Sequence, residues 1–285
     1  MRVFSRDRWL RLGLLFLVLS LFSSARAASV WKVTGPNGGV LYLGGSIHGL
    51  NSTDYPLPSA YNRAFDASSA LVIEDDPNVS KREMEKFMKS GFYPRGDSLK
   101  NHLDPRTYDY LRRIFALAHI PEAELLRCKP WMVVEQLIAP TTNNLGVEAF
   151  LMGRARMNHK PILGLETFRE HQDVIAGLPD KEAELVLLEN FVPQTPGTDL
   201  QKKILSAWRK GDVDEIARLD QGLQRDLPDF AARLITDRSR NWIPKIERYI
   251  RDRHTYFVVA GAGHMGGRNG VVAMLRARGY KVEQL

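Results

Sequence analysis

The chain has 285 residues, a formal net charge of +7 and a single cysteine, Cys128. A lone cysteine excludes an internal disulfide, so a hydrophobic core must hold the fold together. Five arginines and one aspartate among the first 27 residues carry +4 of the charge, which leaves +3 for residues 28–285. The remaining chain has no dense basic run, so nucleic-acid binding has little support.

Residues 1–27 have the pattern of a secretory signal peptide. Arginines precede the apolar stretch Leu12–Phe22, and Ala25-Arg26-Ala27 is a small-x-small cleavage site. The stretch is shorter than the roughly 20 residues that span a bilayer. We expect cleavage after Ala27 and a periplasmic or secreted protein, with an uncleaved membrane anchor as the alternative. The mature chain contains no apolar run long enough for a membrane span.

Short apolar runs predict strands near both ends of the mature chain. The first two flank a turn rich in glycine, which predicts a β-hairpin. The others are rich in Val, Ile, Leu and aromatic residues and are bounded by Gly or Pro, as in strands buried on both faces. The expected strands are Val30–Thr34, Val40–Gly44, Ala70–Ile73, Pro161–Leu165, Tyr256–Ala260 and Tyr280–Gln284.

The middle of the chain predicts helices, because its apolar residues recur at three- and four-residue spacing. We expect helices over 82–88, 108–118 and 131–138, two more after the capping boxes Thr167-x-x-Glu170 and Thr198-x-x-Gln201, and a long helix over about 228–251 that Pro244 interrupts or kinks. A final helix stops at Gly279.

These elements predict an α/β fold with a central mixed sheet. The sheet is built from the N- and C-terminal segments, helices flank it in three layers, and a mostly helical insert occupies about 80–160. We expect a single domain over residues 28–285.

Four ionisable side chains follow predicted strands. His48 and His264 each end a Gly-x-x-His motif, while Glu74 and Glu166 come directly after apolar runs. If the strands are parallel, the four converge, because ligands of open α/β sheets bind outside the carboxyl ends of the strands. Two histidines and two carboxylates suit a divalent metal or acid–base chemistry. Each residue also has a plainer interpretation, as a capped loop histidine, a solvated acid or a first-turn acid favoured by the helix dipole.

The glycines of these turns allow the chain to leave a buried strand sharply. Their backbone N–H groups could also hold an anion or a developing oxyanion, and the candidates are Gly45, Gly261 and Gly263. The remaining histidines, including His171, lack ligand spacing, and we interpret them as structural or surface residues. Cys128 has no glycine turn or histidine nearby, which favours a core residue over a nucleophile.

The stretches "YLGGSIHGLNST", "LVIEDD", "KPILGLET" and "FVVAGAGHMGGRNGVVAMLRARGYKVEQL" resemble the TraB/GumN family, in particular its exported GumN-like branch. The paired Gly-x-x-His motifs are shared with the Tiki metalloproteases, and erythromycin esterases and haem-binding ChaN-like proteins are more distant relatives. The resemblance implies that His48 and His264 are active-site residues with Glu74 beside them. It also implies a metal such as Mn²⁺ or Co²⁺ in Tiki-like members, whereas the esterases act without an obligatory metal.

Two positions depart from the pattern of the family. The family often has an Arg-Asn pair before a tryptophan, and here Ser239 follows Arg238, so that Arg240 could take the place of Arg238 after a register shift. Where the family often has Gly-x-Asp, this chain has Glu148, which is one methylene longer. Both departures concern the geometry of the site and not the fold.

From these observations we expect a periplasmic, metal-dependent hydrolase that resembles Tiki-type metallopeptidases and acts on a peptide or small molecule. His48, His264 and Glu74 would hold Mn²⁺, Co²⁺ or Zn²⁺, while Glu74, Glu166 and Arg238 would take part in catalysis. The alternatives are a non-catalytic protein that binds a peptide, a metal or haem in the same cleft, and a partner-interaction protein. The sequence leaves the oligomeric state open.

Overall fold

The computed structural model describes residues 28–138, 146–191 and 199–285. The expected signal peptide and the first residue of the Thr198-x-x-Gln201 box lie outside these ranges. Within them, no helix combines the length and apolarity needed to cross a membrane.

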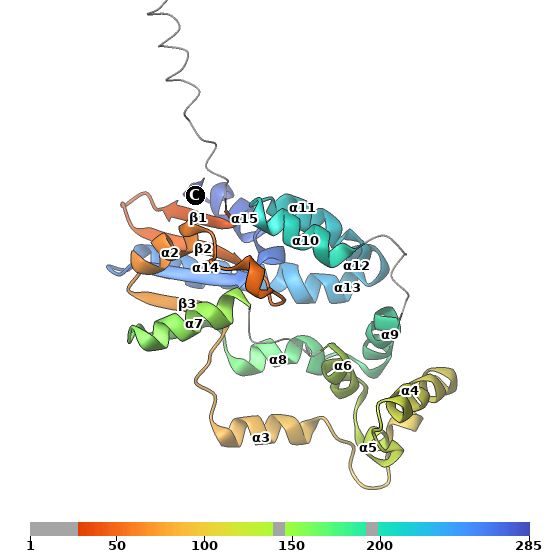
Figure 1. The fold of residues 1–285 in the computed structure, drawn as a ribbon. Helices are drawn as coiled ribbons and strands as arrows, with labels where there is room; N and C mark the ends of the chain where they lie inside the picture. Colours follow the sequence, from red (N-terminus) through yellow and green to blue (C-terminus); the bar gives the residue numbers. More distant parts are fainter. Residues whose placement is uncertain (1–27, 139–145, 192–198) are drawn as a thin grey trace, which may run out of the picture.

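A six-stranded mixed sheet forms the centre of the molecule, as the sequence predicted (Figure 1). Its order is β4-β3-β5-β2-β1-β6, and the four strands from β4 to β2 are parallel. The predicted hairpin pairs β1 with β2, and β6 from the C-terminus pairs with the other side of β1. The strands are β1 (Val30–Thr34), β2 (Val40–Ser46), β3 (Ala70–Asp75), β4 (Ile162–Glu166), β5 (Tyr256–Gly261) and β6 (Lys281–Gln284).

Helices cover both faces of the sheet. The connections from β2 to β3 and from β3 to β4 step along the sheet in one direction, and the connection from β4 to β5 steps back. Because such crossovers are right-handed, α2 and α7 lie on one face and α14 lies on the other. These helices are α2 (Ser59–Asp66), α7 (Val147–Met157), α10 (Leu200–Arg209), α11 (Val213–Leu219), α14 (Arg238–Arg251) and α15 (Val271–Ala277).

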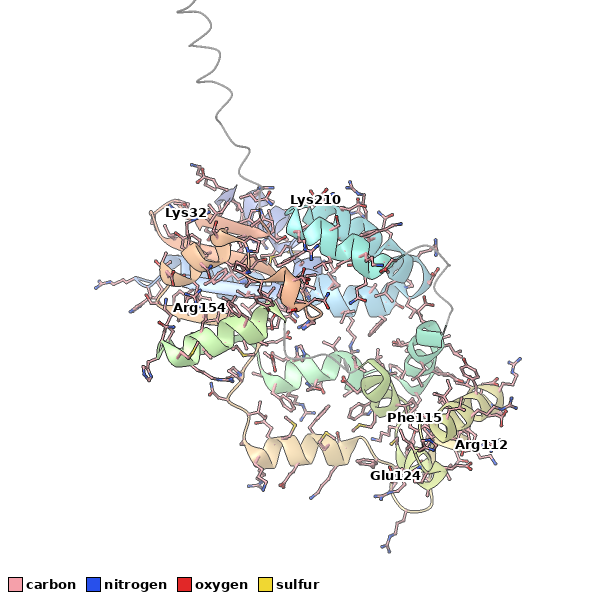
Figure 2. All side chains as sticks on the ribbon, viewed as in Figure 1. Lys32, Arg112, Phe115, Glu124, Arg154 and Lys210 are labelled. Atoms are coloured by element: carbon pink, nitrogen blue, oxygen red, sulfur yellow. The ribbon has the colours of Figure 1, made fainter. Side chains whose placement is uncertain are left out.

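A second group of helices packs away from the sheet, in the lower part of Figure 1. It has its own apolar cluster, with Leu111, Leu125 and Leu187 fully buried. Phe115 packs inside this cluster, whereas Arg112 and Glu124 of the same helices are exposed (Figure 2). The group comprises α3 (Lys81–Ser90), α4 (Pro105–Leu117), α5 (Glu122–Arg127), α6 (Pro130–Ile138), α8 (Phe168–Ala176) and α9 (Asp180–Phe191).

The middle helices therefore divide between two cores. Helix α7 lies within the expected insert but buries Val147 and Leu151 against the sheet. Helix α9 lies beyond residue 160 but buries Val186 and Leu187 in the second cluster. The apolar face of each helix, and not its position along the chain, decides which core it joins.

The long helix expected over about 228–251 is interrupted before Arg238 and not at Pro244, where the sequence predicted a break or kink. It consists of α13 (Pro228–Ala231), a π-helical segment (Ala232–Asp237) and α14, which continues through Pro244. A proline removes one backbone hydrogen bond, and the buried Trp242, Ile243 and Ile246 hold α14 against the sheet. The short helix α12 (Gln221–Asp226) precedes this unit, and Asp199 caps α10 through the N–H of Lys202.

Candidate active site

The carboxyl ends of the four parallel strands meet at one edge of the sheet. Asp75 of β3 is level with Glu166 of β4, and Ser46 of β2 is level with Gly261 of β5. After β3 the chain passes through α3 to α6 and returns to the sheet as α7 on one face, whereas after β5 it continues to α15, which packs on α14 on the other face. The chain thus leaves neighbouring strands toward opposite faces, and this arrangement forms the crevice in which α/β proteins bind ligands.

One guanidinium group joins two carboxylates in this crevice. Arg238 begins α14, and its Nη2 lies 2.5 Å from Oε2 of Glu74 and 2.5 Å from Oε1 of Glu166. All three residues are buried, with exposures of 7% to 8%. Arg240 is exposed and pairs with Asp237 instead, so Arg238 is the arginine that faces the site. Buried charges require such pairing, because an isolated buried charge is costly.

Glu74 links strand β3 to the turn after β5. Its Oε1 accepts a hydrogen bond of 2.6 Å from the N–H of Gly261. Burial raises the pKa of Glu74. The charge of His264, which is protonated at the acidic pH where Glu74 titrates, the charge of Arg238 and this hydrogen bond outweigh burial and lower the pKa to about 2. Glu166 likewise has a lowered pKa, since its bonds from His171, Arg238 and Trp242 outweigh burial. Both carboxylates are therefore ionised at neutral pH.

His264 lies behind the arginine and is 3% exposed. Its Nε2 is 3.4 Å from Nη1 of Arg238, and its Nδ1 is 2.9 Å from Oγ of Ser239. Because arginine only donates, Nε2 is the acceptor, and Nδ1–H donates to the hydroxyl of Ser239. Burial lowers the pKa of His264 to about 4, so the ring is neutral at neutral pH. Ser239 has no exposed surface, so it cannot act as a nucleophile on a substrate.

His171, which the sequence indicated to be a structural or surface residue, lies in the same cluster. Its Nδ1 is 2.7 Å from Oε1 of Glu166 and 3.0 Å from Nη2 of Arg238. Burial alone would lower its pKa, but the bond to Glu166 raises it above the ordinary value. The capping box of Thr167 and Glu170 starts α8 directly after β4, and this places a residue one turn later beside the strand end. In the sequence, only the spacing Glu166-x-x-x-x-His171 could have indicated that His171 lies beside Glu166.

Glu148 also belongs to this edge, although it was not among the candidate site residues. It lies in the first turn of α7, is half-buried, and accepts a hydrogen bond of 3.0 Å from Oγ of Ser46. Burial and the negative charge of Glu74 raise its pKa to about 8. Glu148 is therefore mostly protonated at neutral pH, in contrast to Glu74.

His48 is not brought into the cluster. Strand β2 continues to Ser46, two residues farther than predicted, and the chain then packs against Gly146, where an added Cβ would lie 3.0 Å from the carbonyl oxygen of His48. His48 is exposed, and it makes no hydrogen bond or ion pair with any described residue. The two Gly-x-x-His motifs thus end differently, with His264 buried and His48 at the surface.

Two of the expected backbone donors are already engaged. The N–H of Gly45 donates to the carbonyl of Ser29 at 2.7 Å, and the N–H of Gly261 donates to Glu74. Gly263 lies in the turn that carries His264, close to the carboxylate of Asp220. Neither Gly45 nor Gly261 offers a free N–H to an oxyanion in this arrangement.

The charged cluster offers three ligand atoms to a divalent metal, but a cation already lies among them. Within the described ranges, one group has three ligand atoms all within 4.8 Å of one another, and its members are Glu74, Glu166 and His171. Neither His48 nor His264 belongs to it. The Nη2 of Arg238 lies 2.5, 2.5 and 3.0 Å from these residues, in the place that a metal ion would take. The arrangement therefore does not fit a metal while Arg238 holds this position.

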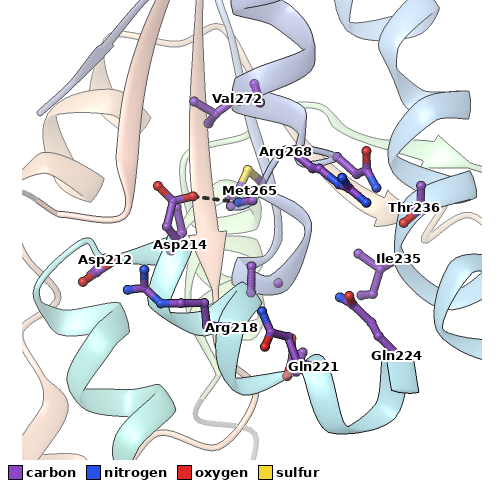
Figure 3. A pocket seen from close by; sticks show the side chains of 18 of the residues that line it. Asp212, Asp214, Arg218, Gln221, Gln224, Ile235, Thr236, Met265, Arg268 and Val272 are labelled. Atoms are coloured by element: carbon purple, nitrogen blue, oxygen red, sulfur yellow. Dashed lines mark hydrogen bonds between the residues drawn. The ribbon is translucent and has the colours of Figure 1, made fainter. Parts of the chain in front are cut away.

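A cavity of about 1090 Å³ lies on the other side of the turn that carries His264 (Figure 3). Its walls come from α11, α12, the π-helical segment, α15 and the loop residues 263 and 265–269, without His264. Asp214 holds this loop by accepting from the N–H of Gly267 at 2.7 Å. The lining includes Gln221, Gln224 and Thr236 but none of Glu74, Glu166, His171 and Arg238. The cavity thus adjoins the charged cluster without containing it.

Comparison with known proteins places the chain in a family. The profile of the TraB/PrgY/gumN family matches residues 29–284. The uncharacterized protein YbaP of Escherichia coli K12 is 24% identical over 277 residues, which cover 93% of this chain and all of YbaP. An uncharacterized protein of Treponema pallidum is also 24% identical, over 87% of this chain and 80% of its own length. No solved structure gives a significant match. The chain therefore belongs to the TraB/PrgY/gumN family.

Proposed function

We propose that the chain is a hydrolase that acts by general acid–base catalysis at the carboxyl edge of the sheet, on an amide or ester bond of a peptide or small molecule. One observation carries this proposal. Two glutamates at the same edge have pKa values pushed apart, to about 2 for Glu74 and about 8 for Glu148. Opposed pKa shifts of neighbouring carboxyl groups are typical of acid–base sites; here Glu148 keeps a proton, and ionised Glu74 supplies the charge that holds it there.

Glu148 is the proposed general acid. Its pKa of about 8 keeps the proton on the carboxyl group at neutral pH, and its half-buried position leaves part of the group accessible. A protonated carboxyl beside a scissile bond can donate to the leaving nitrogen or oxygen, which contributes about 10² to 10⁴ in rate. The hydrogen bond from Ser46 holds the group in place.

His171 is the proposed general base. Nδ1 lies 2.7 Å from the ionised Glu166 and 3.0 Å from Nη2 of Arg238, and the shorter contact with the carboxylate assigns the proton of the neutral ring to Nδ1, which leaves Nε2 as an acceptor. No described residue bonds Nε2, and 32% of the side chain is exposed. A carboxylate that fixes the tautomer of a histidine is a known way to prepare a base. Although burial lowers the pKa of His171, the hydrogen bond to Glu166 raises it above its ordinary value, so Glu166 increases the basicity of the ring.

Glu74, Arg238 and His264 act in this proposal through the other two residues. The negative charge of Glu74 raises the pKa of both Glu148 and His171, so one buried carboxylate supports the acid and the base together. Arg238 keeps Glu74 ionised and holds Glu166 against His171. These three are positioning residues, and their removal is expected to change the pH profile as well as the rate.

The test is a cleavage screen of peptide and ester libraries by the mature chain, with a chelator present. Glu148→Gln and His171→Gln are each expected to lower kcat by about 10² to 10⁴. The matched controls are Glu85→Gln and His254→Gln, which change exposed residues of the same types. Absence of cleavage by the wild type, or equal rates for all five proteins, would refute the proposal. Peptide binding without turnover would favour a non-catalytic binding protein.

The proposal includes export. The basic segment, apolar stretch and small-x-small site of residues 1–27 support a periplasmic or secreted location for the mature chain.

A further inference from the structure

We infer that Arg238 is the built-in cation of this site, and that its guanidinium occupies the volume in which Glu74, Glu166 and His171 would otherwise hold a divalent metal. The inference concerns the binding of an ion. It stands apart from hydrolysis, so turnover is not its readout.

The geometry of the three ligand atoms suggests a latent metal site. Two carboxylate oxygens and one imidazole nitrogen lie within 4.8 Å of one another, and a small inward movement, to separations of at most about 4.4 Å, would give a common ion metal–ligand distances of about 2.0–2.2 Å. Oxygen and imidazole ligands of this kind suit Mn²⁺, Co²⁺ and Zn²⁺. The Nη2 of Arg238 lies among them at 2.5, 2.5 and 3.0 Å. A nitrogen at that position and an ion cannot be present together.

Arg238 is also firmly anchored. Its Nε donates to both oxygens of Glu166 at 3.1 and 3.2 Å, and its Nη1 donates to the carbonyl of Leu234 at 3.3 Å. The guanidinium lies over the ring of Trp242, 5.0 Å from the ring centre. The π-helical segment ends directly before Arg238, and such segments often occur at functional sites. An incoming ion would have to displace all these contacts, so the arginine competes with it effectively.

Removal of the arginine would upset the charge balance of the site. Glu74 and Glu166 are buried and ionised, and Arg238 is the cation between them. Without it, two carboxylates would lie unpaired in a buried site, which is costly. A divalent ion would restore the balance with the ligands already in place. We therefore expect Arg238→Ala to convert the site from one that excludes divalent ions to one that binds them.

The experiment measures Co²⁺ binding by visible absorption and Mn²⁺ binding by calorimetry, on mature chain freed of metal with a chelator. The wild type and the neighbouring control Arg240→Ala should show no binding that depends on His171. Arg238→Ala should bind one equivalent, and the double variant Arg238→Ala/His171→Ala should lose that binding. Thermal unfolding should show the same pattern, with Mn²⁺ raising the Tm of Arg238→Ala alone.

Two results would overturn the inference. The first is one equivalent of bound metal in the wild type that His171→Ala abolishes, because Arg238 would then not occupy the site. The second is a folded Arg238→Ala, judged by circular dichroism, that binds no ion at His171. If Arg238→Ala does not fold, Arg238→Met, which retains more of the side-chain volume, takes its place. The comparison of wild type with His171→Ala shows whether the wild type binds metal at this site, whether or not the Arg238 variants fold.

Discussion

Replacing Glu148 with glutamine should make the folded protein less sensitive to alkali. The pKa of Glu148 in the folded state, about 8, lies above its ordinary value of 4.5. The folded chain therefore binds this proton more tightly than the unfolded chain does. By linkage, the stability that depends on the proton is complete below about pH 4.5 and is lost as the pH rises through about 8.

The size of the effect can be worked out from the same shift. A pKa that moves from 4.5 to about 8 corresponds to at most about 5 kcal/mol, at roughly 1.36 kcal/mol per pH unit. Glu148 is only half-buried, so solvent screening reduces our expectation to about 2–3 kcal/mol. Glutamine keeps the acceptor for Ser46 but cannot ionise, so Glu148→Gln should escape this loss.

The assay is urea unfolding of wild type and Glu148→Gln at pH 5 and pH 9. The difference in unfolding free energy between the two proteins should change by about 2–3 kcal/mol between these pH values, in favour of the variant at pH 9. Glu85→Gln, which changes an exposed glutamate, should show no such change. Parallel pH dependences for wild type and Glu148→Gln would refute the reasoning, because the burial of an ionisable Glu148 would then cost nothing.

Other changes test further parts of the account. The proposed hydrolysis by the wild type should slow as pH rises through about 8, where Glu148 loses its proton, and a rate that keeps rising would count against the general acid. Glu74→Gln should move this alkaline limb to lower pH, because the charge of Glu74 raises the pKa of Glu148; an unmoved limb would contradict the positioning role. Trp208→Phe should cost about 0.5–1.5 kcal/mol in urea unfolding, since its indole N–H donates to the buried carbonyl of Gly45 at 2.8 Å while Tyr61 also donates to that carbonyl, and an unchanged stability would argue against that bond. N-terminal sequencing of the exported protein should begin at Ala28, whereas a retained N-terminus would support the membrane anchor.

The strand ends could be predicted from the sequence. Apolar runs bounded by turn residues located β3 and β4, and the rule that ligands bind at carboxyl ends then brought Glu74 and Glu166 together. These predictions succeed because a buried strand requires a run of apolar residues, and such a run can be recognised within a few positions of the sequence. The three-layer order was predictable for the same reason, once helices were seen to separate the strands.

The partners of those strand ends were harder to predict. The choice between Arg238 and Arg240 depends on which side of α14 faces the sheet, and the π-helical segment before it changes that register. His171 reaches the cluster because α8 begins immediately after β4, and a single histidine in a helix gives no periodic signal. His48 shares its motif with His264, but His264 lies in a buried 3-10 turn directly after β5, whereas His48 follows β2 in an exposed position.

The opposed pKa values could not be read from sequence at all. Glu74 and Glu148 are both followed or preceded by apolar residues, yet one pKa is lowered and the other raised. The difference arises because Arg238 and Gly261 bond to Glu74, while Glu148 faces the charge that Glu74 retains. Such a contrast depends on distances between elements that lie far apart in the chain.

Infrared difference spectroscopy measures directly, without any substrate, whether Glu148 carries a proton at neutral pH. Comparison of wild type with Glu148→Gln should reveal the carbonyl stretch of one protonated carboxyl group at pH 7, which fades as the pH rises through about 8. A difference spectrum that shows only ionised carboxylate at pH 7 would contradict the assignment of Glu148 as the acid of this site.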